Sequence, residues 1–588
     1  MAAWKTKAAS VPDALAEHTR HGRGYRFARG AVASGSRCAG FFTRGREVRA
    51  ADHFRRGGTS LRILAVLAAM AVVIAVPFAL KPKDNLLAAA DDSLVVVSPH
   101  NEAIRYEFSR AFAEYYKKKT GRSVRLDWRL PGGTSEIARV LKGEYYASFE
   151  REWTLGGRAW TPAVAAAFDN PKIRPADAAA LDTPAQTARR AFLSSQRGIG
   201  MDLFFGGGAF DFEQQAAAGR LVPCDAILNH GLTGDSIPEK VSGEIFYDAG
   251  GRWIGACLAS FGICYNSDSL RRLGVKALPA SWRDLTSPLL FRQVALADPT
   301  KSGSAAKAFE MIIQQQMQDL VREAGTEDPA ILAVGWKRGL EIIQAASANA
   351  RYFTDAAGKV PMDVSLGDAA VGMCIDFYGR FQSESVKIGP APSRLQYFTP
   401  VGGSSVGVDP IGLLRGAPNR AVAEEFVAFV LSLEGQKLWN FQVGTPGGPA
   451  KYALRRLPVR KELYAPEFAG FRSDPDVMPY QEAGLFTYHP AWTAPLFKTM
   501  SFIIRVMCLD PHDEQASAWK ALAAAGFPSG ALKKFSDVSA VDYETARNQI
   551  AHVLASPDRI DEVRLAKELG GRFRAQYQEA ERLAKEGK

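Results

Sequence analysis

The amino-acid sequence predicts an α/β fold, in which the strands of a mostly parallel sheet alternate with helices. Short apolar runs such as 94–97 and 294–297 have the character of strands buried on both faces. Each run ends at a loop of small polar residues, and most of these loops lead into a stretch with apolar residues at helical spacing. This alternation calls for a sheet whose two faces are both covered by helices.

The stretch 294–307, VALADPTKSGSAAK, shows the pattern most clearly. An apolar run stops at Asp298, a polar loop follows, and a long helix is expected to begin with Ser302 or Ser304 as its N-cap. Free N–H groups at a helix start attract anions, and Gly303 allows a ligand to approach the backbone closely. An ordinary capped helix has the same sequence signature, so this stretch alone does not define a site.

Similar loops follow three earlier strands. The run 94–97 leads through a short loop into a helix expected over about 104–119. The run 124–128 ends at a Gly-Gly-Thr-Ser loop, and a third strand over 201–205 ends in three consecutive glycines. Polar loops at the ends of strands are where open α/β sheets bind ligands.

The second half of the chain continues the alternation. A longer apolar run at 253–265 is followed by a short helix. The run 369–377 predicts a buried strand that delivers Asp376 and Tyr378 at its carboxyl end. Two regions depart from this order: 143–200 is expected to be an inserted helical element, and 461–588 a helical C-terminal extension packed on the main body.

The charge distribution argues against nucleic-acid binding. The 588 residues carry a net charge of +11, but residues 1–60 hold twelve Lys and Arg against four Asp and Glu. The rest of the chain is therefore close to neutral, and we expect no nucleic-acid partner. The basic leader, rich in Arg, Gly and Ala, is expected to be disordered.

The leader runs into an apolar segment at 61–80 whose single charge is Arg62. Its length and the positive charge before it fit a transmembrane helix with a cytoplasmic N-terminus. They also fit a signal peptide cleaved after the alanines at 88–90. On either interpretation the chain from about 91 onward is exported, and it is periplasmic, either soluble or anchored to the inner membrane.

The sequence lacks the signatures of an enzyme or a zinc site. There is no Gly-x-Ser-x-Gly elbow, no Walker loop and no His-Glu-x-x-His motif. The six cysteines form no Cys-x-x-Cys pair, and one disulfide is compatible with export. We therefore expect a binding protein rather than an enzyme, with no resident cofactor. His100 is singled out among the eight histidines because it lies on a strand-end loop.

Several segments, in order along 94–460, resemble the periplasmic solute-binding proteins of ABC transporters, in particular the two-lobed group that includes ferric-iron binding proteins. The segments are VVVSPHNEAI, GGTSEI, DLFFGGGAFD, SFGICYN, SWRDL to SGSA, GDAAVGMCIDFYGR, TPVGGSSV and GTPGGPAKYALRRLPVR. The resemblance implies a type II periplasmic binding protein fold, in which two α/β lobes close by hinge bending around a ligand. It places the first lobe at 91–261 and 396–460 and the second at 262–395, and it implies docking on ABC permease subunits.

The resemblance also implies which residues line the cleft between the lobes. His100 and Tyr378 match metal ligands of the iron-binding members, but Phe377 stands where a second Tyr is expected. A ferric site with only one phenolate is less favourable, so the predicted solute is an organic or phosphorylated small anion, with ferric iron as the alternative solute. The alternative function is a membrane-anchored ligand sensor. The implied ligand-binding residues are Ser98, His100, Asn101, Gly133, Thr134, Ser135, Gly207, Gly208, Asp298, Ser302, Gly303, Ser304, Asp376 and Tyr378.

Overall fold

The structure is a computed structural model. It describes residues 90–588 apart from 177–181, 230–233 and 557, together with Leu67 and Met70. Contacts divide the chain into residues 1–86 and residues 87–588, and everything below concerns the second unit. The expected leader and most of the apolar segment lie outside the described residues, so both remain predictions. Within the described part, no helix combines the length and the apolar character that a membrane crossing needs.

A mixed sheet with the helices on it forms what we call the first lobe. Its strand order is β14-β7-β13-β3-β1-β2, with β4 alongside β13. Strands β1, β2 and β3 run parallel, whereas β13 runs antiparallel to β3, β4 and β7. The strands are β1 (Asp92–Val97), β2 (Val124–Arg129), β3 (Leu203–Phe205), β4 (Leu221–Val222), β7 (Trp253–Ala259), β13 (Gly407–Leu414) and β14 (Leu457–Pro458). The helices are α2 (Glu102–Thr120), α3 (Thr134–Leu155), α6 (Ala209–Ala218), α7 (Asp225–Leu228), α13 (Arg420–Leu431) and α14 (Leu433–Asn440).

A second mixed sheet, of order β10-β9-β11-β8-β12, forms the second lobe with its helices. Strands β10, β9 and β11 run parallel, and β8 runs antiparallel to β11 and β12. The strands are β8 (Phe261–Asn266), β9 (Val294–Ala297), β10 (Ala350–Thr354), β11 (Val371–Ile375) and β12 (Leu395–Phe398). The helices are α8 (Ser267–Arg272), α9 (Gly303–Ala324), α10 (Pro329–Ala348), α11 (Lys359–Leu366) and α12 (Asp376–Ser385).

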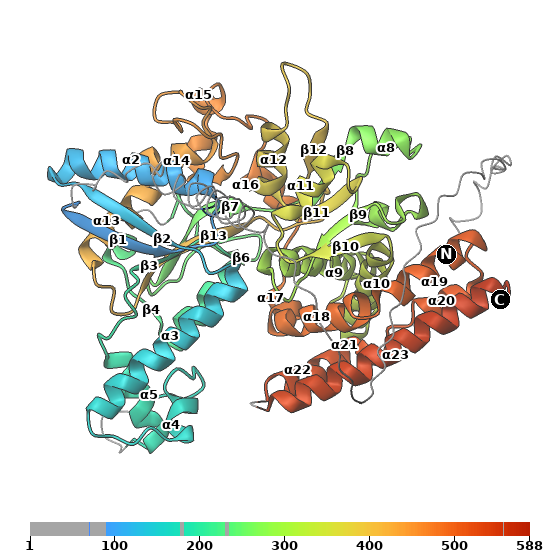
Figure 1. Cartoon of the computed structure of the whole chain (residues 1–588), viewed down its shortest axis with the longest axis horizontal. Helices are drawn as coiled ribbons and strands as arrows, with labels where there is room; N and C mark the ends of the chain where they lie inside the picture. The colour runs from blue at the N-terminus through green and yellow to red at the C-terminus, as the bar shows by residue number, and fades with distance from the viewer. Residues whose placement is uncertain (1–66, 68–69, 71–89, 177–181, 230–233, 557) are drawn as a thin grey trace, which may run out of the picture. The chain divides into compact units, whose positions relative to one another are not determined.

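The chain passes between the two sheets twice. One crossing runs from β7 to β8 through Ser260, and the other runs from β12 to β13 through residues 399–406. The hydroxyls of Ser260 and Thr399 lie 3.2 Å apart, so the two crossing segments are neighbours. Figure 1 shows the sheet of β1–β3 and the sheet of β9–β11 side by side, with β7 and β13 between them. The α/β, two-lobed fold class is confirmed; the exact lobe boundaries remain predictions.

The inserted element contains α4 (Pro162–Ala167) and α5 (Pro184–Ser194) beside the end of α3. It has its own aromatic core, because the rings of Phe149, Phe168 and Phe192 lie with centroids 5.1 to 5.3 Å apart. In Figure 1 these helices stand below the first sheet. A short ribbon of β5 (Lys240–Val241) and β6 (Glu244–Ile245) precedes β7.

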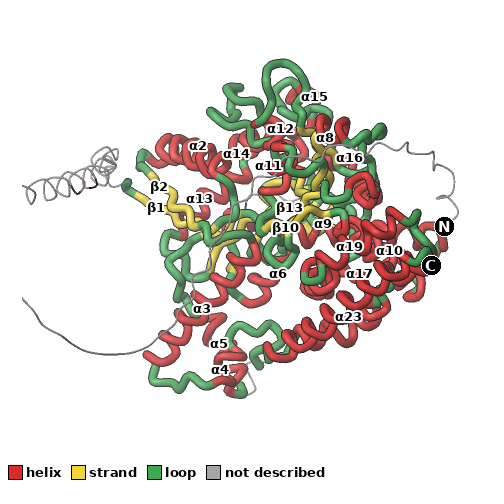
Figure 2. Tube along the Cα trace, turned by 45° about the vertical axis from the view of Figure 1, so that its right-hand side comes forward, coloured by secondary structure: helices red, strands yellow, loops and turns green. Residues whose placement is uncertain are grey.

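Residues after 460 are mostly helical and pack on α10. The indole N–H of Trp336 donates to the carbonyl of Val541 at 2.9 Å, and Gln344 donates to the Tyr577 hydroxyl at 2.8 Å. Figure 2 shows α10, α19 and α23 in one helical group. The helices are α15 (Pro466–Ala469), α16 (Pro479–Glu482), α17 (Pro490–Thr493), α18 (Phe497–Ile504), α19 (His512–Ala524), α20 (Ser529–Phe535), α21 (Tyr543–Thr545), α22 (Ala551–Leu554) and α23 (Arg559–Lys585).

The five described cysteines are all free and buried. They are Cys224, Cys257, Cys264, Cys374 and Cys508. The disulfide that the sequence left open is therefore not formed among them. The thiols behave as small apolar side chains in the core.

Candidate functional site

A cavity of about 110 Å³ lies between the lobes, beside the crossing segments. We call it the interlobe cavity. Its walls come from the loop after β3 with the start of α6, the β5–β6 ribbon, the start of α9, the end of β11, the strand ends beside the crossing segments, and the C-terminal extension. Representative lining residues are Gly207, Gly208, Asp211, Glu213, Glu244, Ala259, Phe261, Gly303, Ser304, Lys307, Val408, Asp409, Tyr488, Pro490 and Phe497.

The predicted loops of the two lobes meet at this cavity. Gly207 has φ of +121°, and a Cβ there would lie 2.6 Å from the Cγ2 atom of Thr134, so both the conformation and the space require glycine. A Cβ on Gly133 would lie 3.2 Å from the carbonyl oxygen of Lys301 in the other lobe. A Cβ on Gly303 would lie 3.9 Å from the Cβ of Thr134. Small residues therefore let the loops at 133–134, 207–208 and 301–304 approach closely.

Other predicted residues have local backbone roles. The Asn101 side chain accepts the N–H of Ile104 at 3.1 Å and caps α2. The hydroxyl of Ser98 accepts the N–H of His100 at 3.0 Å. Asp298 accepts the N–H of Thr300 at 2.8 Å and holds the turn before α9. Ser98, Asn101, Asp298, Ser302 and Ser135 are not among the residues that line the interlobe cavity.

Ser302 and Ser304 have different roles, which variants of each will separate. Ser302 is the N-cap of α9, where its hydroxyl accepts the N–H of Ala305 at 3.3 Å, whereas Ser304 lines the cavity. We expect Ser302→Ala to lower the free energy of unfolding by about 1 kcal/mol. Ser304→Ala should change it little and act on ligand affinity instead. Urea unfolding of both variants checks this, and equal destabilisation would contradict it.

A cluster of buried side chains links the lobes next to the cavity. We call it the interlobe cluster; it consists of the polar residues His100, Asp376, Asp409 and Arg456 and the ring of Phe377. The fully buried guanidinium of Arg456 pairs with Asp409 of β13 and lies 3.3 Å from the Nε2 atom of His100. Its central carbon lies 3.9 Å from the centroid of the Phe377 ring, which belongs to the second lobe. The cluster therefore joins the two lobes through one arginine side chain.

The cluster shifts the pKa values of its members. Burial, with the nearby charges of Arg456 and Arg105, lowers the pKa of His100 well below its usual value, so this imidazole is neutral. Burial raises the pKa of Asp376 to about 6, although Arg380 and Arg456 act in the opposite direction. The Nδ1 atom of His100 and the Oδ1 atom of Asp376 are buried without a hydrogen-bond partner among the described residues.

The predicted ferric-iron ligands, His100 and Tyr378, belong to a poor environment for a metal cation. Arg456 places a positive charge beside the imidazole that the metal would need. Burial raises the pKa of Tyr378, which opposes the phenolate form that ferric iron prefers. No group of three or more His, Cys, Asp or Glu side chains suited to a metal occurs in the described part of the chain.

The cavity walls carry more acidic than basic groups. Burial raises the pKa of Asp211 to about 6, although the charge of Lys498 acts in the opposite direction. The pKa of the largely exposed Glu213 is also raised, by partial desolvation and by like-charge repulsion from Glu244, against the charge of Lys307. The Nζ atom of Lys307 lies 3.1 Å from Glu244 and 3.0 Å from Glu310, so this charge is already neutralised. Asp211 and Glu213 make no ion pair with another described side chain within the salt-bridge distance, so the cavity keeps negative charge.

The C-terminal extension forms one wall of the cavity and contacts both lobes. The N–H of Tyr488 donates to the carbonyl of Ser242 at 2.7 Å, and its hydroxyl donates to Glu310 of α9 at 2.9 Å. Lys307 lies 3.5 Å from the centroid of the Tyr488 ring. The ring of Phe497 lies 4.6 Å from that of Phe210 at the start of α6.

Several of these residues were missed from the sequence. Lys307 lies one turn after Gly303, and Asp211 lies three residues after Gly208. Residues three or four positions into a helix lie on the same face as its first residue, so helical periodicity could have placed both side chains near the predicted loops. Arg456 lies within the quoted segment GTPGGPAKYALRRLPVR but was given no role. Nothing in the sequence pointed to Tyr488 and Phe497, because only the tertiary fold brings the extension to the cavity.

Comparison with known proteins shows what the chain is similar to. Residues 200–474 match the family model of bacterial extracellular solute-binding proteins. These residues contain the crossing segments, the second lobe and most of the cavity walls. This region of the chain is therefore similar to bacterial extracellular solute-binding proteins.

Individual relatives are more distant. An uncharacterized protein of Haemophilus influenzae is 28% identical over 181 residues, which are 31% of this chain and 45% of that protein. The chain thus matches less than half the length of this curated relative. The periplasmic binding protein AfuA of Actinobacillus pleuropneumoniae, solved with fructose-6-phosphate, is 18% identical over 59% of this chain and 82% of its own, with a TM-score of 0.39. Iron-bound HitA of Pseudomonas aeruginosa is 17% identical over 70% of this chain and 99% of its own, with a TM-score of 0.41.

Proposed function

We propose that this protein is the substrate-binding component of an ABC import system. In this proposal it captures a small solute in the interlobe cavity, outside the inner membrane, and delivers it to permease subunits without chemical change. The observation that carries the proposal is the cavity itself, because loops from both lobes meet around it next to the two crossing segments. Two lobes that share a ligand site close around the ligand by hinge motion. The ligand-bound protein then differs in shape from the free protein, and a permease can recognise that difference.

The charges of the cavity favour a positively charged solute over the anion expected from the sequence. The buried Arg456 and the partly buried Lys307 are each paired with carboxylates of the protein. Asp211 and Glu213 remain available, and an anion would meet them across the cavity from the start of α9. The rings of Tyr488 and Phe497 also suit an organic cation, since an ammonium group is attracted to aromatic faces.

Thermal melting of the 87–588 unit tests this proposal. A ligand at a hundred times its Kd stabilises the folded state by about 2.7 kcal/mol, which a melting curve resolves clearly. We expect organic ammonium compounds to raise the melting temperature more than sugars, phosphate esters or ferric citrate. Stabilisation by phosphate esters alone would support a solute-binding protein but refute the positive charge. Stabilisation by none of these classes would refute the proposed function.

The pKa of Asp211, about 6, predicts how pH acts on binding and on stability. A cation needs the ionised carboxylate, so its affinity should rise about tenfold from pH 5 to pH 7. The ligand-free protein should behave oppositely. The folded carboxyl holds its proton up to about pH 6, while the unfolded one ionises near its usual value of 3.8, so stability falls as pH rises between these values. Isothermal titration of Asp211→Asn should show no rise in affinity, and an unchanged pH profile would contradict the assignment.

A further inference from the structure

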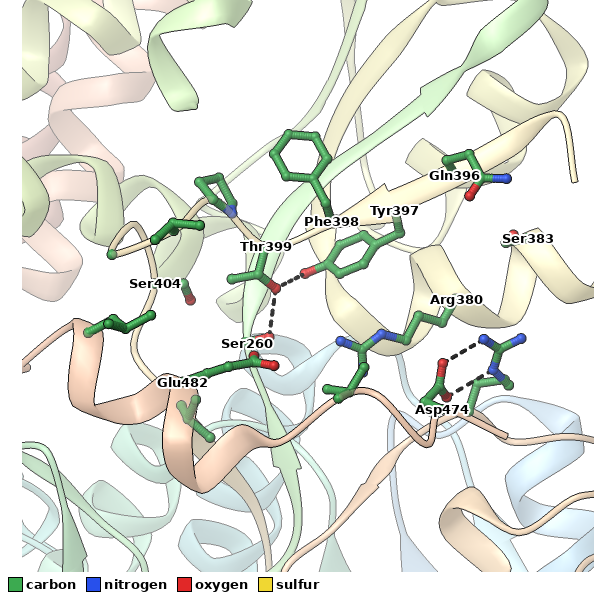
Figure 3. Close-up of a pocket in the computed structure, with 17 residues that line it drawn as sticks. Ser260, Arg380, Ser383, Gln396, Tyr397, Phe398, Thr399, Ser404, Asp474 and Glu482 are labelled. Carbon is green, nitrogen blue, oxygen red and sulfur yellow. Dashed lines mark hydrogen bonds and ion pairs between the residues drawn. The ribbon is translucent and has the colours of Figure 1, made fainter. Parts of the chain in front are cut away.

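A second pocket, of about 430 Å³, lies on the other side of the crossing segments. We call it the hinge pocket (Figure 3). Ser260 lines it, whereas the adjacent residues Ala259 and Phe261 line the interlobe cavity. Successive residues of an extended chain point to opposite faces, so the two spaces lie on opposite sides of the crossing. They share no lining residue.

A chain of hydroxyl groups crosses the hinge pocket. The Tyr397 and Thr399 hydroxyls lie 3.2 Å apart, and Thr399 lies 3.2 Å from the hydroxyl of Ser260 (Figure 3). Each hydroxyl can donate one hydrogen bond and accept two, so this chain retains capacity for a ligand. It also spans both crossing segments, because Ser260 belongs to one and Thr399 to the other.

Two of the four charged side chains in the hinge pocket satisfy each other. Arg455 donates to both oxygens of Asp474, at 2.9 and 2.6 Å, and its remaining terminal nitrogen donates to Glu384 at 2.9 Å. A bidentate pair of this kind is a strong structural contact and leaves little for a ligand. Arg455 and Asp474 therefore stabilise the wall of the pocket and are not expected to bind a ligand.

The other two charged side chains, Arg380 and Glu482, face each other without pairing. Arg380 is 9% exposed, and among the described residues its guanidinium donates a hydrogen bond to Asp376 alone, at 3.3 Å. Glu482 accepts the N–H of Met478 at 3.3 Å through one oxygen. Figure 3 shows the guanidinium and the carboxylate directed toward one another from opposite sides of the pocket, next to Thr399 and Ser260. Burial lowers the pKa of Arg380, but Asp376, Asp474, Tyr397 and Glu482 more than offset this, so the guanidinium is charged.

We propose that the hinge pocket is a second ligand site and that it binds a small zwitterion, with a carboxylate on Arg380 and an ammonium group on Glu482. A ligand with only a negative charge would be repelled by Glu482, and a ligand with only a positive charge would be repelled by Arg380. A molecule with both charges satisfies both side chains, and the hydroxyl chain supplies further hydrogen bonds. The volume of about 430 Å³ is large enough for an amino acid. This proposal does not depend on the function of the interlobe cavity.

Calorimetric titration of the full chain with L-alanine, β-alanine and 4-aminobutanoate tests the proposal. These probes carry both charges at three separations, while acetate and methylammonium each carry one. We expect at least one zwitterion to bind and neither single ion to bind at the same concentration. Glu482→Gln should weaken that binding at least tenfold, and the exposed Glu467→Gln should leave it unchanged.

Further variants distinguish binding in the hinge pocket from binding in the interlobe cavity. Thr399→Val removes one hydroxyl without touching either charge, and it should weaken binding less than Glu482→Gln does. Absence of binding by all three zwitterions would overturn the proposal. Binding that survives Glu482→Gln but disappears in Asp211→Asn would also overturn it, because the ligand would then belong to the interlobe cavity. A normal melting curve for Glu482→Gln shows that the variant is folded.

Discussion

Replacing Lys307 by methionine is expected to lower the free energy of unfolding by about 3–5 kcal/mol. Lys307 lies on α9 of the second lobe and pairs with Glu244 of the β5–β6 ribbon and with Glu310. Glu310 is fully buried and Glu244 is 6% exposed, so methionine would leave two carboxylates buried without their cation. Burial lowers the pKa of Lys307, but these carboxylates more than offset it, and the net upward shift keeps the amine charged.

A matched control is available six residues earlier in the chain. Lys301 is 53% exposed and lies 3.9 Å from Asp298, so Lys301→Met should change the free energy of unfolding by less than about 1 kcal/mol. Urea unfolding of the 87–588 unit, followed by tryptophan fluorescence, measures both variants. If Lys307→Met were no more destabilising than Lys301→Met, the contacts that Lys307 makes between α9, Glu244 and Tyr488 would not contribute to the stability of the fold.

The fold could be predicted to a large extent because hydrophobic periodicity and caps are local signals. The expected strand at 294–297 is β9, and the helix expected after the Ser-Gly-Ser loop is α9, with Ser302 as its N-cap. The run 94–97 lies within β1, and the run 201–205 contains β3. The prediction of mostly parallel sheets was less accurate, because the crossing strands β7, β8 and β13 add antiparallel pairs. Their direction depends on which lobe the chain enters, and no local pattern encodes that.

The candidate site could be predicted only where glycines and helix starts mark it. The loops at 133–134, 207–208 and 303–304 do come together in the structure. Asn101, Asp298 and Ser302 looked equally suitable, but their side-chain oxygens bind nearby backbone N–H groups. Asp, Asn and Ser are favoured at helix caps for that same reason, so the signal for a cap and the signal for a ligand site coincide.

The charge of the site depends on distant segments, so the anion expected from the sequence and the cation proposed from the structure rest on different signals. The free N–H groups at the start of α9 are a local signal, and taken alone they indicate an anion site. The tertiary fold places Asp211, Glu213 and Asp409 around the same space. Two segments far apart in the chain contribute these carboxylates, and a third contributes Arg456, the cationic partner of Asp409. Their combined field therefore appears only once the lobes are assembled.

Replacing Arg456 by methionine is expected to have a comparably large effect and to separate the lobes. The fully buried guanidinium pairs with Asp409 and stacks on Phe377, so the variant leaves a buried carboxylate without its partner. Removing one member of such a pair costs about 3–5 kcal/mol. Because Asp409 and His100 belong to the first lobe and Phe377 to the second, we also expect the variant to adopt a more open arrangement. Small-angle X-ray scattering should then give a larger radius of gyration for the 87–588 unit.

A double variant distinguishes the buried charge from simple loss of packing. Arg456→Met with Asp409→Asn removes both charges, and it should recover a large part of the stability that Arg456→Met loses. The exposed pair of Arg420 with Glu424 supplies the control, since Arg420→Met should change stability by less than about 1 kcal/mol. Loss of Arg456 should also raise the pKa of His100, because the arginine is one of the causes that lower it. An NMR titration that found this pKa unmoved, together with no recovery in the double variant, would show that packing rather than charge holds the lobes together here.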